Sequence, residues 1–194
     1  VEIATGILFI LNIYAMPTFY EDLPSILIKL YGSVFSIILL ILSIFDFKFF
    51  WLPQAITFSG LFLGFICSLI ADSLTNLSEF YYLLNSIKAS IIGFLVFFIL
   101  SRFGRAIYGK PILGDGDIKL SALIGSWLGI QGLFISWWIA FNTAGIFVIS
   151  GLLLKKINRT QKIPFGIFLA LGAFSVWYFG NEKLSEFILL KKII

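Results

Sequence analysis

Three aspartates at the borders of long apolar runs are the residues of this sequence best suited to chemistry. Asp115 and Asp117 alternate with glycines in "KPILGDGDIKLSALIG", residues 110–125, just ahead of an apolar run. Asp46 follows another apolar run and opens "DFKFFWLP", residues 46–53. Carboxylates in or beside membrane helices are costly, and they mark a function when they face the protein interior. These aspartates are therefore the first candidates for a functional site.

Two aspartates that share one site can hydrolyse a peptide bond. They cannot both ionise easily, so one carboxyl keeps its proton while the other is charged. The charged carboxylate takes a proton from water and the protonated one donates to the peptide carbonyl, so the two protons belong to the pair. The sequence contains no histidine, which excludes Ser-His and Cys-His hydrolysis and HExxH zinc hydrolases.

Each aspartate also fits a structural role. Asp117 stands where the N-cap of the following helix is expected. Asp46 lies near Lys48 and is compatible with a solvated charge beside a membrane. Asp115 fits simple loop polarity. The spacing alone leaves these roles and the catalytic pair open.

The composition places the chain in a membrane. Hydrophobic residues make up 60% of the 194 residues and charged residues 12%, with a mean hydropathy of +1.04. A soluble domain carries about twice that charged fraction. The net charge of +4 comes from basic residues scattered in short loops, so no nucleic-acid partner is expected. The single cysteine, Cys67, excludes a disulfide within the chain and a paired-cysteine zinc site. The first residue is not methionine, and we expect a fragment or a processed form.

Apolar runs of nearly bilayer length predict the architecture. We expect an all-α, polytopic membrane helix bundle with about seven transmembrane helices, in one core of residues 1–180. Residues 181–194 are expected to form a short C-terminal tail that includes an interfacial helix. The predicted spans cover residues 3–16, 25–45, 54–71, 84–102, 118–129, 132–153 and 164–179.

Lysine and arginine near the span ends predict the orientation. One set of loops holds nine basic residues: Lys48, Arg102, Arg105, Lys110, Lys119, Lys155, Lys156, Arg159 and Lys162. The opposite set holds Lys29 and Lys88. The first set is therefore expected in the cytoplasm, which brings Asp46 and Asp117 to the same membrane depth.

Four segments in order resemble motifs of the type IV prepilin peptidases. "DFKFFWLP" looks like their Asp-x5-Leu-Pro motif, and "GDGDIKLSALIGSWLG" (114–129) resembles their Gly-x-Gly-Asp-x-Lys-Leu motif. "IPFGIFLALGAF" (163–174) is similar to their Pro-Phe-Gly segment, and "VEIATGILF" (1–9) to the stretch that opens their membrane core. Together the four segments cover nearly the whole chain.

The resemblance implies a GxGD-type intramembrane aspartyl protease. Its catalytic pair maps to Asp46 and Asp117, while supporting or substrate-binding positions map to Gly114, Gly116, Lys119, Pro53, Pro164 and Gly166. It implies cleavage of short basic leaders from prepilins or pseudopilins, anchored by one apolar helix, at the cytoplasmic face of the bacterial inner membrane. Asp115 fills the motif's variable position and receives no role.

The sequence departs from the family pattern in places that affect cofactors and substrate fit. Gln54 stands where the family often has aspartate. Many members carry a preceding region with paired CxxC motifs, and some N-methylate the product with S-adenosylmethionine. This sequence starts after that region, so neither zinc nor methylation is predicted, and no cofactor or metal is expected.

Three alternatives remain open at this stage. The first is a non-catalytic carrier or channel subunit that binds cations or protons with its aspartates. The second is a presenilin-like or preflagellin peptidase. The third is a lipid-handling enzyme that holds a metal and a phosphate between carboxylates.

Overall fold

The fold is a bundle of helices, as predicted from the apolar runs. The computed structural model describes residues 23–75, 80–109, 113–156 and 163–188, and these residues contain no strand. The helices are α2 (Ser25–Phe49), α3 (Gln54–Thr75), α4 (Tyr81–Tyr108), α5 (Asp115–Leu153), α6 (Gly166–Phe179) and α7 (Asn181–Ile188). Among the described residues, α2, α3, α4 and α5 are long and apolar enough to cross a membrane, and α6 is a shorter apolar helix. The all-α membrane class is therefore confirmed.

Prolines mark where helices begin. Pro24 is the N-cap of α2, Pro53 directly precedes α3, and Pro164 lies two residues ahead of α6. Proline is tolerated at a helix start because its missing N–H has no partner there in any case. The predicted spans 25–45, 54–71, 84–102 and 164–179 correspond to α2, α3, α4 and α6, and the first three helices extend four to six residues beyond the predicted ends. The predicted span 3–16 lies outside the described residues.

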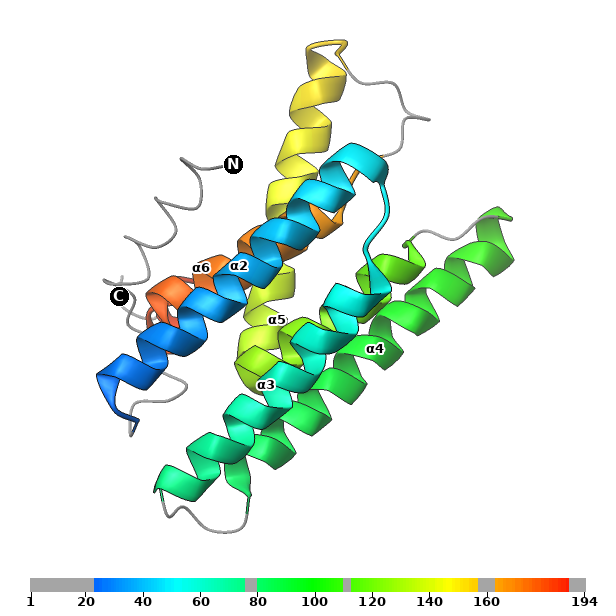
Figure 1. The fold of residues 1–194 in the computed structure, drawn as a ribbon. Helices are drawn as coiled ribbons and strands as arrows, with labels where there is room; N and C mark the ends of the chain where they lie inside the picture. Colours follow the sequence, from blue (N-terminus) through cyan, green and yellow to red (C-terminus); the bar gives the residue numbers. More distant parts are fainter. Residues whose placement is uncertain (1–22, 76–79, 110–112, 157–162, 189–194) are drawn as a thin grey trace.

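The predicted spans 118–129 and 132–153 belong to one helix, α5, with a break at Gly129. Gly129 has φ 64° and ψ −174°, a conformation essentially restricted to glycine. Asn85 of α4 holds the break, since its Oδ1 accepts a hydrogen bond from the Ile130 N–H at 3.3 Å. Figure 1 shows the two parts of α5 running in different directions on either side of this point.

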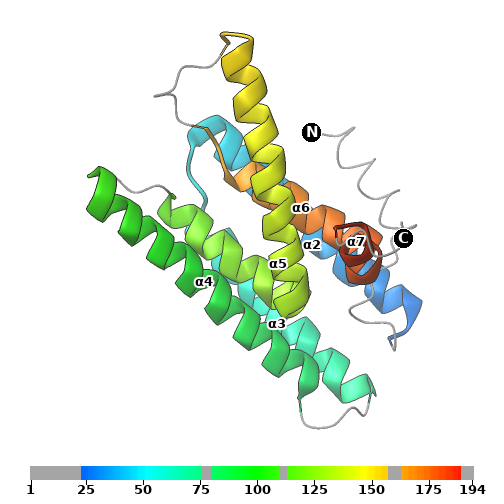
Figure 2. The same cartoon turned by 180° about the vertical axis from the view of Figure 1, so that it is seen from behind.

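The break lets α5 join two groups of helices. Its first part runs beside α3 and α4, and its second part passes α6, which packs on α2 (Figures 1 and 2). At the centre, Trp127 of α5 stacks on Phe35 of α2 with ring centroids 4.9 Å apart, and Trp177 of α6 meets the same ring at 5.7 Å. Trp127 also donates its indole N–H to the Gly60 carbonyl of α3 at 2.8 Å. One aromatic cluster therefore ties four helices together.

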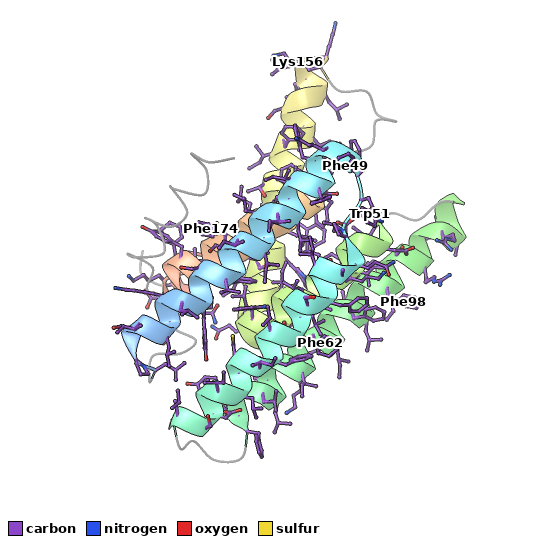
Figure 3. The ribbon with its side chains drawn as sticks, in the orientation of Figure 1. Phe49, Trp51, Phe62, Phe98, Lys156 and Phe174 are labelled. Atoms are coloured by element: carbon purple, nitrogen blue, oxygen red, sulfur yellow. The ribbon has the colours of Figure 1, made fainter. Side chains whose placement is uncertain are left out.

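The outer surface of the bundle is apolar. Phe49 and Phe62 lie on it and are 64% and 60% exposed (Figure 3). Apolar side chains also cover the outer faces of α4 and α5, including Ile99 and Ile146. An apolar surface of this extent is the surface that lipid tails require of a membrane-spanning bundle.

Candidate active site

Asp46 lies in the last turn of α2, and its side chain is only 6% exposed. The helix ends because Phe50 adopts a left-handed conformation, and the Phe50 N–H donates to the Asp46 carbonyl at 3.0 Å. Leu52 and Pro53 are then buried, and α3 begins at Gln54. The motif "DFKFFWLP" is thus a helix end, a tight turn and the start of the next helix.

Asp117 lies in the first turn of α5 and is buried. Gly114 is the N-cap residue, and its backbone N–H donates to Asp117 Oδ2 at 3.2 Å. The preceding segment is fixed from α4, because the Ser101 hydroxyl donates to the Leu113 carbonyl at 2.9 Å. Asp117 is therefore the third residue of the helix and not its N-cap, and its Oδ2 stabilises the helix start by accepting this hydrogen bond. Its Oδ1 does not take part in this hydrogen bond.

The two carboxylates meet at Gly166, the first residue of α6. A β-carbon placed on Gly166 would lie 2.7 Å from Asp46 Oδ2 and 3.5 Å from Asp117 Oδ1. The backbone N–H groups of Gly166 and Ile167 also interact with the Asp46 carboxylate. Three helix termini, far apart in the sequence, thus bring two buried acids to one point. Because glycine has no side chain, this approach is possible.

Gly116 joins the two aspartate motifs. A β-carbon on Gly116 would lie 2.9 Å from Leu52 Cδ1 and 3.0 Å from Leu52 Cβ. The second glycine of "GDGD" therefore packs directly on the leucine of "WLP". This contact sets the start of α5 against the turn that follows Asp46, so it positions both carboxylates.

A pocket of about 320 Å³ contains the carboxylate pair. Its lining includes most predicted site residues together with the turn after α2: Asp46, Phe50, Trp51, Leu52, Gln54, Gly114, Asp115, Gly116, Asp117 and Lys119. Gly166, Pro53 and Pro164 do not line it: Gly166 contacts Asp46, and each proline lies within two residues of a helix start that borders the pair. Among the residues that the structure describes, no group of three or more His, Cys, Asp or Glu side chains is placed to hold a metal ion.

An apolar groove of about 410 Å³ runs between α2 and α6, next to the pair. It is lined by Ser36, Leu39, Leu40, Ser43, Ile44, Phe47, Lys48, Ile167, Ala170, Leu171 and Phe174. Ile167 belongs both to the groove and to the backbone turn that meets Asp46. Sequence reasoning missed this groove, because it depends on how α2 and α6 pack. The aromatic pocket residues Phe50 and Trp51 were also missed, although they lie inside a motif that was noticed.

Membrane-length apolar helices and two buried aspartates at one pocket define a class of multi-pass membrane proteins built around a carboxylate pair. Within that class the chain belongs to the type IV leader peptidase family, whose sequence model matches residues 33–149. The matched range includes both Asp46 and Asp117.

Curated proteins of several bacteria that are named for leader peptide processing are similar to this chain. A prepilin leader peptidase/N-methyltransferase of Xanthomonas campestris pv. campestris is 24% identical over 188 residues, which cover 97% of this chain and 61% of the relative. Its namesake in Pectobacterium carotovorum subsp. carotovorum is 32% identical over 142 residues, 69% of this chain and 46% of the relative. A type 4 prepilin-like proteins leader peptide-processing enzyme of Escherichia coli O78:H11 is 29% identical over 147 residues, 75% and 50% of the two chains.

The chain spans about half to three-fifths of the length of these relatives. No solved structure matches it.

Proposed function

We propose that this protein is a membrane-embedded aspartyl endopeptidase that removes leader peptides from type IV prepilins or pseudopilins, with Asp46 and Asp117 activating water. The observation that carries the proposal is the approach of the two carboxylates to Gly166 inside one pocket. Membership of the type IV leader peptidase family and the names of the relatives support the substrate class.

The chemistry follows from one proton shared by two acids. The charged carboxylate takes a proton from water while the water oxygen attacks the peptide carbonyl carbon. The protonated carboxyl gives its proton to the carbonyl oxygen, which yields a neutral gem-diol. The carbon–nitrogen bond then breaks as one carboxyl protonates the leaving nitrogen and the other takes a diol proton, which restores the pair. Asp117 Oδ2 is held by the Gly114 N–H, so Oδ1 is the atom available for this exchange.

The distribution of basic residues supports a pair at the cytoplasmic face of the bacterial inner membrane. Lys48 and Arg105 lie in the last turns of α2 and α4, and Lys119 lines the pocket itself. These positions belong to the basic set of loops, which stays on the cytoplasmic side in ordinary inner-membrane proteins.

The apolar groove between α2 and α6 supports a substrate that is anchored by an apolar helix. Eight of its eleven lining residues are aliphatic or aromatic, and one of them, Ile167, directly follows Gly166 in the sequence. A substrate helix that lies in the groove from the lipid side would present its polar preceding segment to Asp46. The groove therefore accounts for how a membrane-anchored chain reaches a buried pair.

Co-expression with a tagged prepilin tests the proposal. Wild type converts the substrate to its mature size, and Asp46→Asn and Asp117→Asn each leave it unprocessed while accumulating in the membrane. Glu182→Gln, an exposed acid in α7, serves as the control and processes normally. Normal processing by either aspartate variant contradicts the proposal, and it is the result that an ion carrier using these aspartates predicts.

A further inference from the structure

The mouth of the pocket carries groups that the proposed chemistry does not use. Asp115, the first residue of α5, is exposed and lines the pocket. Phe50 and Trp51 line it as well and are 54% and 56% exposed. The Asp115 carboxylate has no hydrogen-bond or ion-pair partner within the described ranges. A carboxylate without a partner among the described residues thus borders the same small space as two exposed aromatic residues.

A specific turn puts the aromatic rings there. Phe50 has φ 51° and ψ 34°, a left-handed conformation that is uncommon for a residue with a β-carbon. This conformation ends α2 one turn after Asp46 and directs the chain along the pocket instead of continuing the helix. The aromatic mouth is therefore a consequence of the same turn that positions Asp46.

The charges of the lining favour a cation. The lining includes three acidic residues, Asp46, Asp115 and Asp117, and one lysine, Lys119. The Lys119 Nζ lies 5.7 Å from the centre of the Phe58 ring, which partly satisfies it. Even with one proton shared by the pair, the carboxylates outnumber the ammonium. A cation at the mouth gains both a carboxylate partner and aromatic faces.

A second observation indicates that the pocket takes a ligand. Asp46 Oδ2 is buried and accepts no hydrogen bond of good geometry from the described residues, although the Gly166 and Ile167 N–H groups lie near the carboxylate, and Asp46 lines the pocket. Buried carboxylate oxygens are normally hydrogen-bonded. A buried acceptor at the inner end and an exposed carboxylate at the mouth fit a peptide whose backbone reaches the pair while a side chain stays at the rim.

We infer that Asp115, with Phe50 and Trp51, binds a lysine or arginine side chain of the peptide substrate close to the bond that is cut. This inference rests on the proposed function and adds a specificity residue to it. Asp115 also lies in the first turn of α5, where the helix dipole stabilises a negatively charged side chain. That contribution concerns stability and does not depend on the charge of the substrate.

A charge-swap experiment separates the role of Asp115 in substrate binding from its role in helix stability. Purified enzyme is given three membrane-anchored substrates that differ only in the residues ahead of the cleaved bond. The first substrate has lysine there, the second glutamine and the third glutamate. For wild type we expect a KM for the lysine substrate about tenfold below that of the glutamine substrate, the combined effect of one exposed ion pair and a cation–π contact. Asp115→Asn removes the difference with kcat unchanged, and Asp115→Lys shifts the preference to glutamate. Trp51→Leu loses part of the difference.

The control is Glu182→Gln, which keeps the preference of wild type. Equal KM values for the three substrates with wild type, or a lysine preference that survives in Asp115→Asn and Asp115→Lys, overturn the inference while leaving the peptidase proposal intact. If wild type cleaves none of the substrates, the proposed function falls, and the inference falls with it.

Discussion

Asp46 and Gly166 are in direct contact, although they belong to different helices and to different sequence motifs. The place of a β-carbon on Gly166 is 2.7 Å from Asp46 Oδ2 and 3.1 Å from Asp46 Cγ. Real β-carbons do not approach other atoms so closely, so any side chain at residue 166 must displace Asp46 or α6. The glycine is therefore a spatial requirement of the carboxylate pair.

Gly166→Ala should abolish leader cleavage without unfolding the protein. Moving a reacting carboxylate by about 1 Å costs on the order of 100-fold in rate, and we expect at least that loss. Cleavage of a tagged prepilin, normalised to the amount of enzyme in the membrane, measures it.

Gly145→Ala is the matched control for that substitution. Gly145 lies within α5, and a β-carbon there meets nothing within 4 Å. Alanine should leave cleavage unchanged and favour the helix by about 0.5–1 kcal/mol. Equal activity of the Gly166 and Gly145 variants would contradict the close approach to Asp46.

Gly116→Ala and Leu52→Ala should compensate one another. Alanine at residue 116 overlaps the Leu52 side chain and should cost about 1–3 kcal/mol of stability, because the core cannot absorb an added methyl. Leu52→Ala alone leaves a cavity and costs about 2–5 kcal/mol. Thermal unfolding in detergent should give a double variant that is more stable than the sum of the two effects implies. Strict additivity would show that the two motifs do not touch.

Much of the helical framework is predictable from the sequence, because it depends on local properties. Apolar runs of bilayer length and prolines at their borders define α2, α3, α4 and α6 to within a few residues. The expectation that Asp46 and Asp117 lie at the same end of the bundle also follows from local features, namely which helix end each one occupies. Their roles as a catalytic pair stay a prediction.

The rest depends on packing between helices, which periodicity does not encode. Nothing in "IPFG" indicates that Gly166 touches Asp46, or that α2 and α6 leave a groove between them. The two predicted spans 118–129 and 132–153 are separated at "GIQG", residues 129–132. Helical hydrogen bonding continues there instead through a single break at Gly129, held by Asn85 from a distant part of the chain.

Gly129 should tolerate no other residue. Its backbone conformation costs a residue with a β-carbon about 1–3 kcal/mol, and that carbon would also collide with Asn85 Nδ2. Gly129→Ala is therefore expected to lower the thermal stability by more than Gly109→Ala does. Gly109 also has a positive φ, 72°, but its ψ of −2° lies in the left-handed helical region that other residues adopt at lower cost, and its β-carbon position is open. An equal loss of stability in both variants would contradict a special requirement for glycine at residue 129.

Leu171→Trp should impair cleavage only of substrates that carry an apolar helix. Leu171 lines the groove between α2 and α6 and is 47% exposed, so a larger side chain narrows the groove without entering the core. We expect KM for a full-length anchored substrate to rise several-fold, on the scale of about 1 kcal/mol for lost apolar contact. A short peptide that lacks the helix should be cleaved at the rate of wild type. Ile99→Trp, on the exposed face of α4 and 60% exposed, should leave both substrates unaffected. If both tryptophan variants slow the anchored substrate equally, the effect lies in the surrounding lipid, and the groove does not hold the substrate helix.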